Sequence, residues 1–273
     1  MNKLIVLFYL ILISCETYTS KNESNNNKID SNLEILDSHT EEKYSYLPLS
    51  DGQIVHHNNY SLAYNEKHEQ AIWVYYLLTS DMINGTISRK NNFRVDKKIN
   101  KGSATLSDYK NSGYDRGHLA PAADMKNSAI SMSESFLFSN ISPQVPSFNR
   151  GIWKKLESLV RHWVDSEGDM YIATGPILTD SLGSIGENQV TIPNSFYKII
   201  YCDNKEKMIG FIIPNKKSNN FITNYITNID SIESITNIDF FSGLDDILEK
   251  KLESNVNLTD WDFKNKQNGI IYN

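Results

Sequence analysis

The composition of this chain is that of a globular protein. Of its 273 residues, 40% are hydrophobic and 22% are charged, which excludes a wholly disordered chain and leaves room for one large domain or two small ones. The net charge of −6 argues at first against a polyanionic partner such as nucleic acid. Residues 85–163, however, hold 13 basic and six acidic residues, a local charge of +7, so a polyanion-binding surface is still allowed there.

The first 15 residues are predicted to be an export signal. A short basic start precedes an apolar run at residues 4–14, which is too short to span a bilayer and has the length of a signal-peptide core. The run ends in Leu-Ile-Ser-Cys, and the small residue before Cys15 resembles a bacterial lipobox, whose cysteine is acylated. We therefore predict an exported, extracytoplasmic protein. It is lipid-anchored in a bacterial membrane through Cys15 or, if the segment is an ordinary signal peptide, secreted.

The rest of the chain is predicted to form a tether and one domain. Residues 16–44 are rich in Ser, Asn, Lys and Glu and poor in apolar residues, so we expect a disordered tether. Residues 45–273 are predicted to form one α+β domain, with a central antiparallel sheet and flanking helices. The second cysteine, Cys202, lies in a strand-like run and is expected to be buried rather than nucleophilic.

Strand and helix patterns are interleaved along this domain. His56 and His57 precede the first strand pattern. Because adjacent strand residues point to opposite faces, we expect surface residues rather than a metal-binding pair. The predicted elements are, in order, strands at 60–64 and 71–79, a short helix at 128–137, a longer helix at 150–165, strands at 170–175 and 189–192 that stop at prolines, a hairpin of 196–202 and 208–213, and helices that begin near 230 and span 244–252. In the longer helix, Arg161 is expected to face outward.

Polar residues that can do chemistry are concentrated between residues 114 and 157. The first stretch reads Tyr-Asp-Arg-Gly-His-Leu-Ala-Pro, in which alternation along a strand places Arg116 and His118 on the same face. A guanidinium beside an imidazole suits a phosphate, because the arginine binds the non-bridging oxygens and lowers the pKa of His118. A neutral His118 can then accept a proton from water. The alternative is a structural histidine, which the neighbouring Asp115 and Arg116 disfavour.

Two residues further along the chain suit a metal ion. Asn149 and Glu157 lie eight residues apart near the start of the longer predicted helix, where a regular helix places them about 80° apart on one stripe. An amide oxygen and a carboxylate suit Mg²⁺, which keeps most of its waters and needs few protein ligands. Taken singly, simpler interpretations are favoured: Asn149 as a helix N-cap, Glu157 as a solvated charge and Asn140 as a turn residue.

Three ordered motifs carry a family resemblance. They read Asp-Arg-Gly-His-Leu-Ala-Pro, Ser-Asn-Ile-Ser-Pro-Gln and Asn-Arg-Gly-Ile-Trp-Lys-Lys-Leu-Glu, and a later landmark reads Ile-Pro-Asn-Ser-Phe-Tyr-Lys. In this order and at these intervals they closely resemble the DNA/RNA non-specific endonuclease family, over about residues 45–255. The resemblance implies a ββα-metal (His-Me finger) active site, in which two strands and a helix hold one Mg²⁺, for which Mn²⁺ can substitute.

The resemblance also implies roles for individual residues of the reaction centre. His118 matches the general base of the family. Asn149 matches its direct protein ligand to the metal, and Glu157 matches the residue that holds metal-bound water. Asn140 matches a polar residue that supports the catalytic site.

Substrate contacts are implied in the same way. Arg116 matches an arginine of the motif that faces phosphate and takes part in catalysis. Arg89 matches a further arginine that contacts phosphate, with Arg94 as the fallback because the spacing before the motif varies. Gln144, at the end of the second motif, is also expected to contact substrate.

These assignments predict an endonuclease that hydrolyses DNA and RNA to 5′-phosphate and 3′-hydroxyl ends. Contacts confined to phosphate and sugar would leave the base sequence unread. A homodimer is allowed by the resemblance. The alternatives are a phosphodiesterase that acts on a small nucleotide or a lipid headgroup, and a non-catalytic lipoprotein binding module on the same fold. A zinc protease is disfavoured, because no His-Glu-x-x-His motif occurs in the sequence.

Overall fold

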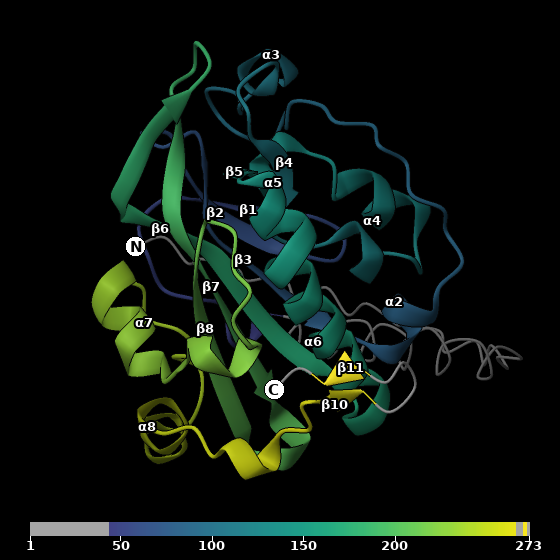
Figure 1. The fold of residues 1–273 in the computed structure, drawn as a ribbon, viewed down its shortest axis with the longest axis vertical. Coiled ribbons are helices and arrows are strands. Elements are labelled where there is room, and N and C mark those ends of the chain that lie inside the picture. The colour runs from purple at the N-terminus through teal and green to yellow at the C-terminus, as the bar shows by residue number, and fades with distance from the viewer. Residues whose placement is uncertain (1–43, 266–269, 272–273) are drawn as a thin grey trace, which may run out of the picture. The chain divides into compact units, whose positions relative to one another are not determined.

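The computed structural model describes residues 44–265 and 270–271 (Figure 1). The strands are β1 (Gln53–His56), β2 (Ser61–Asn65), β3 (Gln70–Leu78), β4 (Asp115–His118), β5 (Ile141–Gln144), β6 (Met170–Ile185), β7 (Val190–Cys202), β8 (Lys207–Pro214), β9 (Ile226–Thr227), β10 (Lys264–Asn265) and β11 (Ile270–Ile271). The helices are α2 (Ser80–Asn84), α3 (Leu106–Tyr109), α4 (Ala129–Glu134), α5 (Pro146–Phe148), α6 (Lys154–Glu167), α7 (Ile229–Thr236) and α8 (Asp246–Ser254). The predicted export signal, and the tether apart from Tyr44, lie outside the described residues. Among the described helices, none combines the length and the apolar character that crossing a bilayer requires.

A seven-stranded sheet forms the centre of the fold. Its strand order is β1-β2-β3-β6-β7-β8-β9, and every neighbouring pair is antiparallel. A separate two-stranded ribbon of β4 and β5 carries the first two sequence motifs. The predicted α+β class with a central antiparallel sheet is confirmed.

Side chains alternate between the two faces of this sheet and build a core on each. One face packs against α6, whose apolar stripe includes Leu156, Leu159 and Trp163, all fully buried. Full burial of such a side chain contributes about 1.5–3 kcal/mol to the free energy of folding. The other face packs against α7 and α8, through residues such as Ile232 and Leu252. Figure 1 shows α6 on one side of the sheet and α7 with α8 on the other.

Two strands continue through prolines at which the sequence patterns predicted that they would stop. β6 continues past Pro176, and β7 begins before Pro193. Pairing of β6 with β3 ends at Thr174, and pairing of β8 with β7 ends at Ser195, so beyond these points each strand has a ladder partner on one side only. A proline is tolerated there, because its missing N–H can face the open edge, and β6 and β7 also shift register nearby.

The helix that carries the third motif is interrupted near its start. α5 is followed by a π-helical turn, Asn149–Trp153, and only then by regular α6. Within the turn, Gly151 has non-helical angles, with φ −104° and ψ −112°. The predicted single helix at 150–165 was therefore wrong at its first turn, and the angle of about 80° between Asn149 and Glu157, which assumes a regular helix, does not apply.

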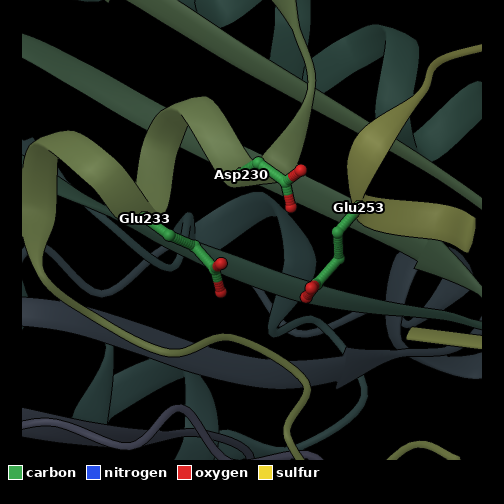
Figure 2. A group of neighbouring side chains, drawn as sticks. All are labelled: Asp230, Glu233 and Glu253. Carbon is green, nitrogen blue, oxygen red and sulfur yellow. The ribbon is translucent and has the colours of Figure 1, made fainter. Parts of the chain in front are cut away.

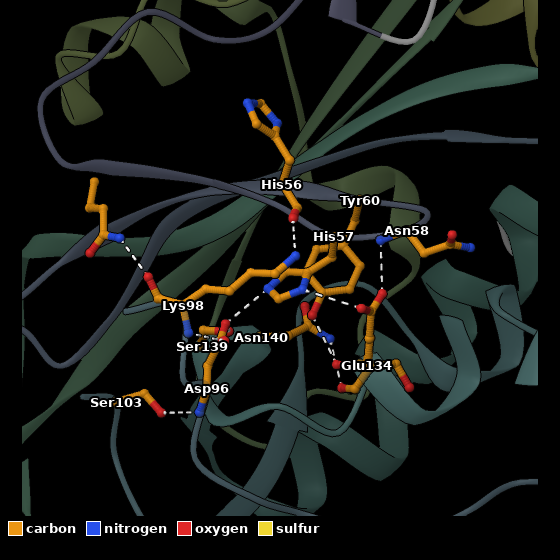
Figure 3. Close-up of polar contacts among 12 residues, drawn as sticks. His56, His57, Asn58, Tyr60, Asp96, Lys98, Ser103, Glu134, Ser139 and Asn140 are labelled. Carbon is orange, nitrogen blue, oxygen red and sulfur yellow. Dashed lines mark hydrogen bonds and ion pairs between the residues drawn. The ribbon is translucent and has the colours of Figure 1, made fainter. Parts of the chain in front are cut away.

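A buried ionic network fixes the long connection between α2 and β4 (Figure 3). Asp96 accepts hydrogen bonds from His57 Nε2 at 2.9 Å and from Ser139 Oγ at 2.6 Å. Glu134 of α4 lies 3.7 Å from His57 Nδ1 and accepts a hydrogen bond from the backbone of Asn58. The expectation that His57 is a surface residue was wrong: it is 4% exposed, and its charge partner is 39 residues away along the chain.

Candidate active site

The ribbon of β4 and β5, together with α5 and α6, places the three motifs next to one another. In the ribbon His118 pairs with Ile141 and Asp115 pairs with Gln144. The chain leaving β4 is held by the fully buried Asn140, whose amide accepts from the backbone N–H of Ala120 and donates to the carbonyls of Ala120 and Ser135. Because these bonds occupy its amide, Asn140 positions the segment that follows His118 and does not face the cavity.

His118 lies at the wall of a cavity of about 410 Å³. Its imidazole is 9% exposed and is held edge-on between Phe93 and Phe136, with ring centroids 5.7 Å and 4.9 Å away. Its Nε2 has no hydrogen-bond partner among the described residues. The imidazole is thus fixed by aromatic contacts, and because its Nε2 is buried, the ring nitrogen that remains for a substrate in the cavity is Nδ1.

The surroundings of His118 keep it neutral. Burial, followed by the positive charges of Arg89 and Arg116, lowers the pKa of His118 to about 3. The sequence predicted this direction from Arg116 alone, whereas burial is the larger cause. A neutral imidazole is the form that can accept a proton.

Two arginines extend over the same aromatic rings that flank His118. The guanidinium of Arg116 lies 4.2 Å from the centroid of Phe93, and that of Arg89 lies 4.9 Å from the centroid of Phe136. Both arginines line the cavity with His118. Arg94 lies elsewhere, because its guanidinium donates to the carbonyl of Ser133 at 2.7 Å and it borders a different hollow beside the buried ionic network. Of the two upstream candidates, the structure therefore brings Arg89 to the site.

Asn149 enters the cavity from the π-helical turn with a defined orientation. Its Nδ2 donates to Asp115 at 2.8 Å. Since an ionised carboxylate only accepts hydrogen bonds, the nitrogen must face Asp115 and the amide oxygen is left for another partner. Asp115 also accepts a hydrogen bond from Arg150 at 2.8 Å. Burial raises the pKa of Asp115, but the hydrogen bonds from Arg150 and Asn149 outweigh burial, so the pKa is lowered and the carboxylate is ionised.

Glu157 lines the same cavity one helical segment later. Burial raises the pKa of Glu157 to about 7, while the positive charges of Lys198 and Arg161 oppose that rise. A carboxylate beside a free amide oxygen is a donor set that suits a hard divalent cation with few protein ligands. The side chains present therefore fit Mg²⁺, with Asn149 as the direct ligand and Glu157 as its carboxylate neighbour.

A second hollow adjoins the first and lengthens the site. It has a volume of about 630 Å³ and shares Arg89, Arg116, Asn149 and Arg150 with the cavity at His118. The two together form a groove with basic walls. An extended polyanion fits such a shape better than a compact ligand does.

Gln144 does not lie where the sequence placed it. It is fully buried, and its amide packs so closely against Gly117 that a Cβ on this glycine would lie 2.1 Å from the side-chain carbonyl carbon. The glycine between Arg116 and His118 is therefore required to accommodate Gln144. A side chain with no exposed surface cannot contact substrate in this conformation, so the predicted substrate contact of Gln144 disagrees with the structure.

The comparisons with known proteins show the family of this chain. Residues 39–247 match the model of the DNA/RNA non-specific endonuclease family. This chain belongs to that family. A nuclease from Nostoc sp. is 34% identical over 76% of this chain and 79% of its own length, and human mitochondrial endonuclease G is 31% identical over 69% of each. A solved EndoG/EndoGI complex contains a chain that superposes with a TM-score of 0.67 at 28% identity, over 72% of this chain and 88% of that one.

Two charged residues at this endonuclease site were missed by the sequence analysis. Arg161 was expected to face outward, but it is half-buried, lines the cavity and donates to Asp124 at 2.7 Å. Lys198 of β7 is buried with its ammonium 5.0 Å from the ring centroid of Trp153, and burial lowers its pKa to about 8 although Glu157 opposes the change. The helical pattern in the sequence shows no partner for the charge of Arg161. The landmark motif that contains Lys198 likewise does not indicate that this lysine would be buried near Glu157.

Proposed function

We propose that this endonuclease hydrolyses the phosphodiester bonds of both DNA and RNA with Mg²⁺ as its cofactor, and leaves 5′-phosphate and 3′-hydroxyl ends. The observation that carries the proposal is the neutral, buried His118, which shares one basic cavity with Arg116, Asn149 and Glu157. The groove walls present guanidinium groups suited to phosphate and no array of amide side chains suited to base edges, which supports cleavage without sequence preference.

The chain's own residues divide the work of hydrolysis. His118 accepts the proton of the attacking water, whose oxygen forms the new bond to phosphorus as the bond to the 3′ oxygen breaks. The departing 3′ oxygen takes up a proton from a second water and becomes the 3′-hydroxyl. Arg116 and Arg89 bind the non-bridging oxygens and hold the phosphate against the imidazole. Asn149 and Glu157 would hold Mg²⁺, which, when bound, stabilises the negative charge that develops in the transition state. Asp115 accepts a hydrogen bond from Nδ2 of Asn149, which turns the amide oxygen of Asn149 away from the Asp115 carboxylate.

The test is degradation of supercoiled plasmid and of single-stranded RNA by the purified protein, with Mg²⁺, with Mn²⁺ and with EDTA. We expect both polymers to be cut with either cation and neither with EDTA. Ends that DNA ligase rejoins without prior kinase treatment identify 5′-phosphate and 3′-hydroxyl groups. Cleavage of a small chromogenic diester but of neither polymer would instead indicate a phosphodiesterase of small substrates, and the absence of all hydrolysis would leave a binding module.

We also propose that the protein is exported and anchored through a lipid on Cys15. The support is the sequence of the first 15 residues, and confinement outside the cytoplasm would separate a nuclease from the genome of its own cell. Labelled palmitate supplied to expressing bacteria should be incorporated into the wild-type protein and not into Cys15→Ser. Equal labelling of both would refute the anchor, and release of unlabelled wild-type protein would indicate an ordinary signal peptide.

A further inference from the structure

Three carboxylates from two helices meet on the face of the sheet opposite α6. Asp230 and Glu233 belong to α7 and Glu253 belongs to the last turn of α8, and their nearest ligand oxygens all lie within 4.8 Å of one another. Figure 2 shows the three side chains turned toward the same space between the helices. Both helices pack on the core of this face, whereas His118 and Asn149 belong to the ribbon and helix of the other.

Glu253 is the member of this group whose position has no explanation in the fold alone. It is 5% exposed, and its Oε1 has no hydrogen-bond partner among the described residues. A carboxylate that is buried without a donor costs several kcal/mol, and the side chain of a glutamate is long enough to reach solvent from many helical positions. Its inward direction indicates that something absent from the protein itself satisfies this oxygen.

The charges around the group are of one sign. Burial raises the pKa of Glu253 to about 9, and the negative charges of Glu233, Glu249, Asp230 and Asp239 add to this rise. Lys251 of α8 lies 3.8 Å from Glu206. The charges with the largest effect on Glu253 are therefore all negative, and a bound cation would offset them.

We propose that Asp230, Glu233 and Glu253 bind a hard divalent cation, Ca²⁺ in particular, which joins α7 to α8. Ca²⁺ takes six to eight oxygen ligands at about 2.3–2.6 Å, so two oxygens on opposite sides of one ion lie about 5 Å apart. The ligand oxygens of the three residues lie within 4.8 Å of one another, close enough to share one such ion. Mg²⁺ demands a near-ideal octahedron and usually binds through one or two carboxylates, so three carboxylates on two helices suit the more flexible coordination of Ca²⁺ better.

Each carboxylate has the freedom that this role requires. One oxygen of Glu233 accepts from the backbone N–H of Phe240 at 2.7 Å, which fixes the side chain and leaves the second oxygen for the ion. Asp230 is exposed, so water can complete the coordination from its side. Glu253 closes the inner side of the site. An ion held in this way stabilises the packing of the two helices and takes no part in hydrolysis.

The experiment measures Ca²⁺ binding to the full chain by isothermal titration calorimetry, in saturating Mg²⁺ so that the proposed catalytic site is already filled. We expect one Ca²⁺ per chain. The melting temperature should rise by about 5–10 °C when Ca²⁺ exceeds its Kd by roughly 100-fold. Glu253→Gln, which keeps the shape of the side chain, should abolish both effects. The matched control Glu187→Gln removes the same charge from an exposed position between β6 and β7 and should keep both.

A second variant keeps the test decisive if Glu253→Gln does not fold. Asp230→Asn changes an exposed side chain and should weaken Ca²⁺ binding at least about tenfold. The proposal is overturned if the wild-type melting temperature does not respond to Ca²⁺, or if either variant binds the ion like wild type. A wild type that ignores Ca²⁺ and a Glu253→Gln variant that melts higher without it would together indicate that the cluster shares a proton instead.

Discussion

Two buried histidines of this endonuclease are surrounded by opposite charges. His57 is 4% exposed and His118 is 9% exposed, and both contact the connection between α2 and β4, the first through Asp96 and the second through Phe93. Burial lowers the pKa of both. At His57 the hydrogen bonds and charges of Asp96 and Glu134 outweigh burial and raise the pKa above 6.5, whereas the arginines near His118 lower it further.

The difference separates a structural histidine from a reactive one. Two carboxylates balance the charge of His57, Asp96 through a hydrogen bond to Nε2 and Glu134 at 3.7 Å from Nδ1, so this histidine fixes the loop. His118 has the opposite arrangement: it lines the cavity, and the groups that repel its proton are the same arginines that would attract a phosphate. What faces a buried imidazole, rather than its burial, decides its role.

The largest expected effect is loss of activity in His118→Ala. Without the base we expect the rate of plasmid cleavage to fall by about 10²–10⁴-fold, which is the usual contribution of a positioned general base. The far-ultraviolet circular dichroism spectrum should stay that of wild type. His56→Ala, at an exposed neighbour of His57, is the control and should keep full activity. A His118→Ala protein that retains most of its activity would show that the base lies elsewhere.

The second effect is on stability, in His57→Ala. Removing one partner of a buried ion pair leaves Asp96 uncompensated and should lower the free energy of unfolding by about 3–5 kcal/mol, measured by urea denaturation. The rate per folded molecule should remain within a few-fold of wild type. If instead His57→Ala is as stable as wild type and inactive, the two histidines have been assigned the wrong way round.

The third effect is on the metal requirement. Asn149→Ala should raise the Mg²⁺ concentration needed for half-maximal cleavage. Loss of a group that only supports a ligand typically costs about 10–100-fold, and loss of the ligand itself should cost more than that. Asp115→Asn should produce a shift within that smaller range, because it releases the orientation of Asn149 and keeps its oxygen. Unchanged Mg²⁺ titrations in both variants would remove Asn149 as a ligand.

The smallest effect is the pH dependence of stability, which should have opposite signs at the two sites. The raised pKa of His57 contributes stability that is complete below pH 6.5 and is lost as the pH rises through the pKa of His57 in the folded protein. The lowered pKa of Asp96 contributes stability that is lost as the pH falls below 3.8. The cost of His57→Ala should therefore be largest between about pH 4 and 6.5. At His118 the unfolded chain takes up the proton first, so His118→Ala should become less costly as pH falls below 6.5. Parallel pH profiles for the two variants would contradict the comparison.

The same contrast shows how much the sequence could predict. His118, Arg116, Asn149 and Glu157 were chosen from short motifs, and the structure brings all four to one cavity, although their roles remain predictions. The motifs could do this because the ribbon of β4 and β5 and the helix after it are close in sequence. The central sheet was visible from apolar runs such as the one that became β3.

What the sequence could not supply were partners that are distant along the chain. The burial of His57 depends on Asp96 and Glu134, and the place of Lys198 depends on β7 passing beneath α6. The predicted end of a strand at Pro176 was wrong for the same reason. A proline is tolerated within β6 only because the neighbouring strand β3 has already ended, and this is not visible locally in the sequence. Such pairings are properties of the assembled sheet and have no local signal.

The most direct test of the central claim is a titration of the histidine ring resonances by nuclear magnetic resonance, with His118 and His57 assigned from the two alanine variants. The resonance that disappears in His118→Ala should stay that of a neutral imidazole from pH 8 to about pH 4, while the one that disappears in His57→Ala should remain protonated above pH 6.5. If His118 instead titrates near 6.5 like a histidine in water, burial and the two arginines do not hold this imidazole neutral, and the contrast with His57 is contradicted.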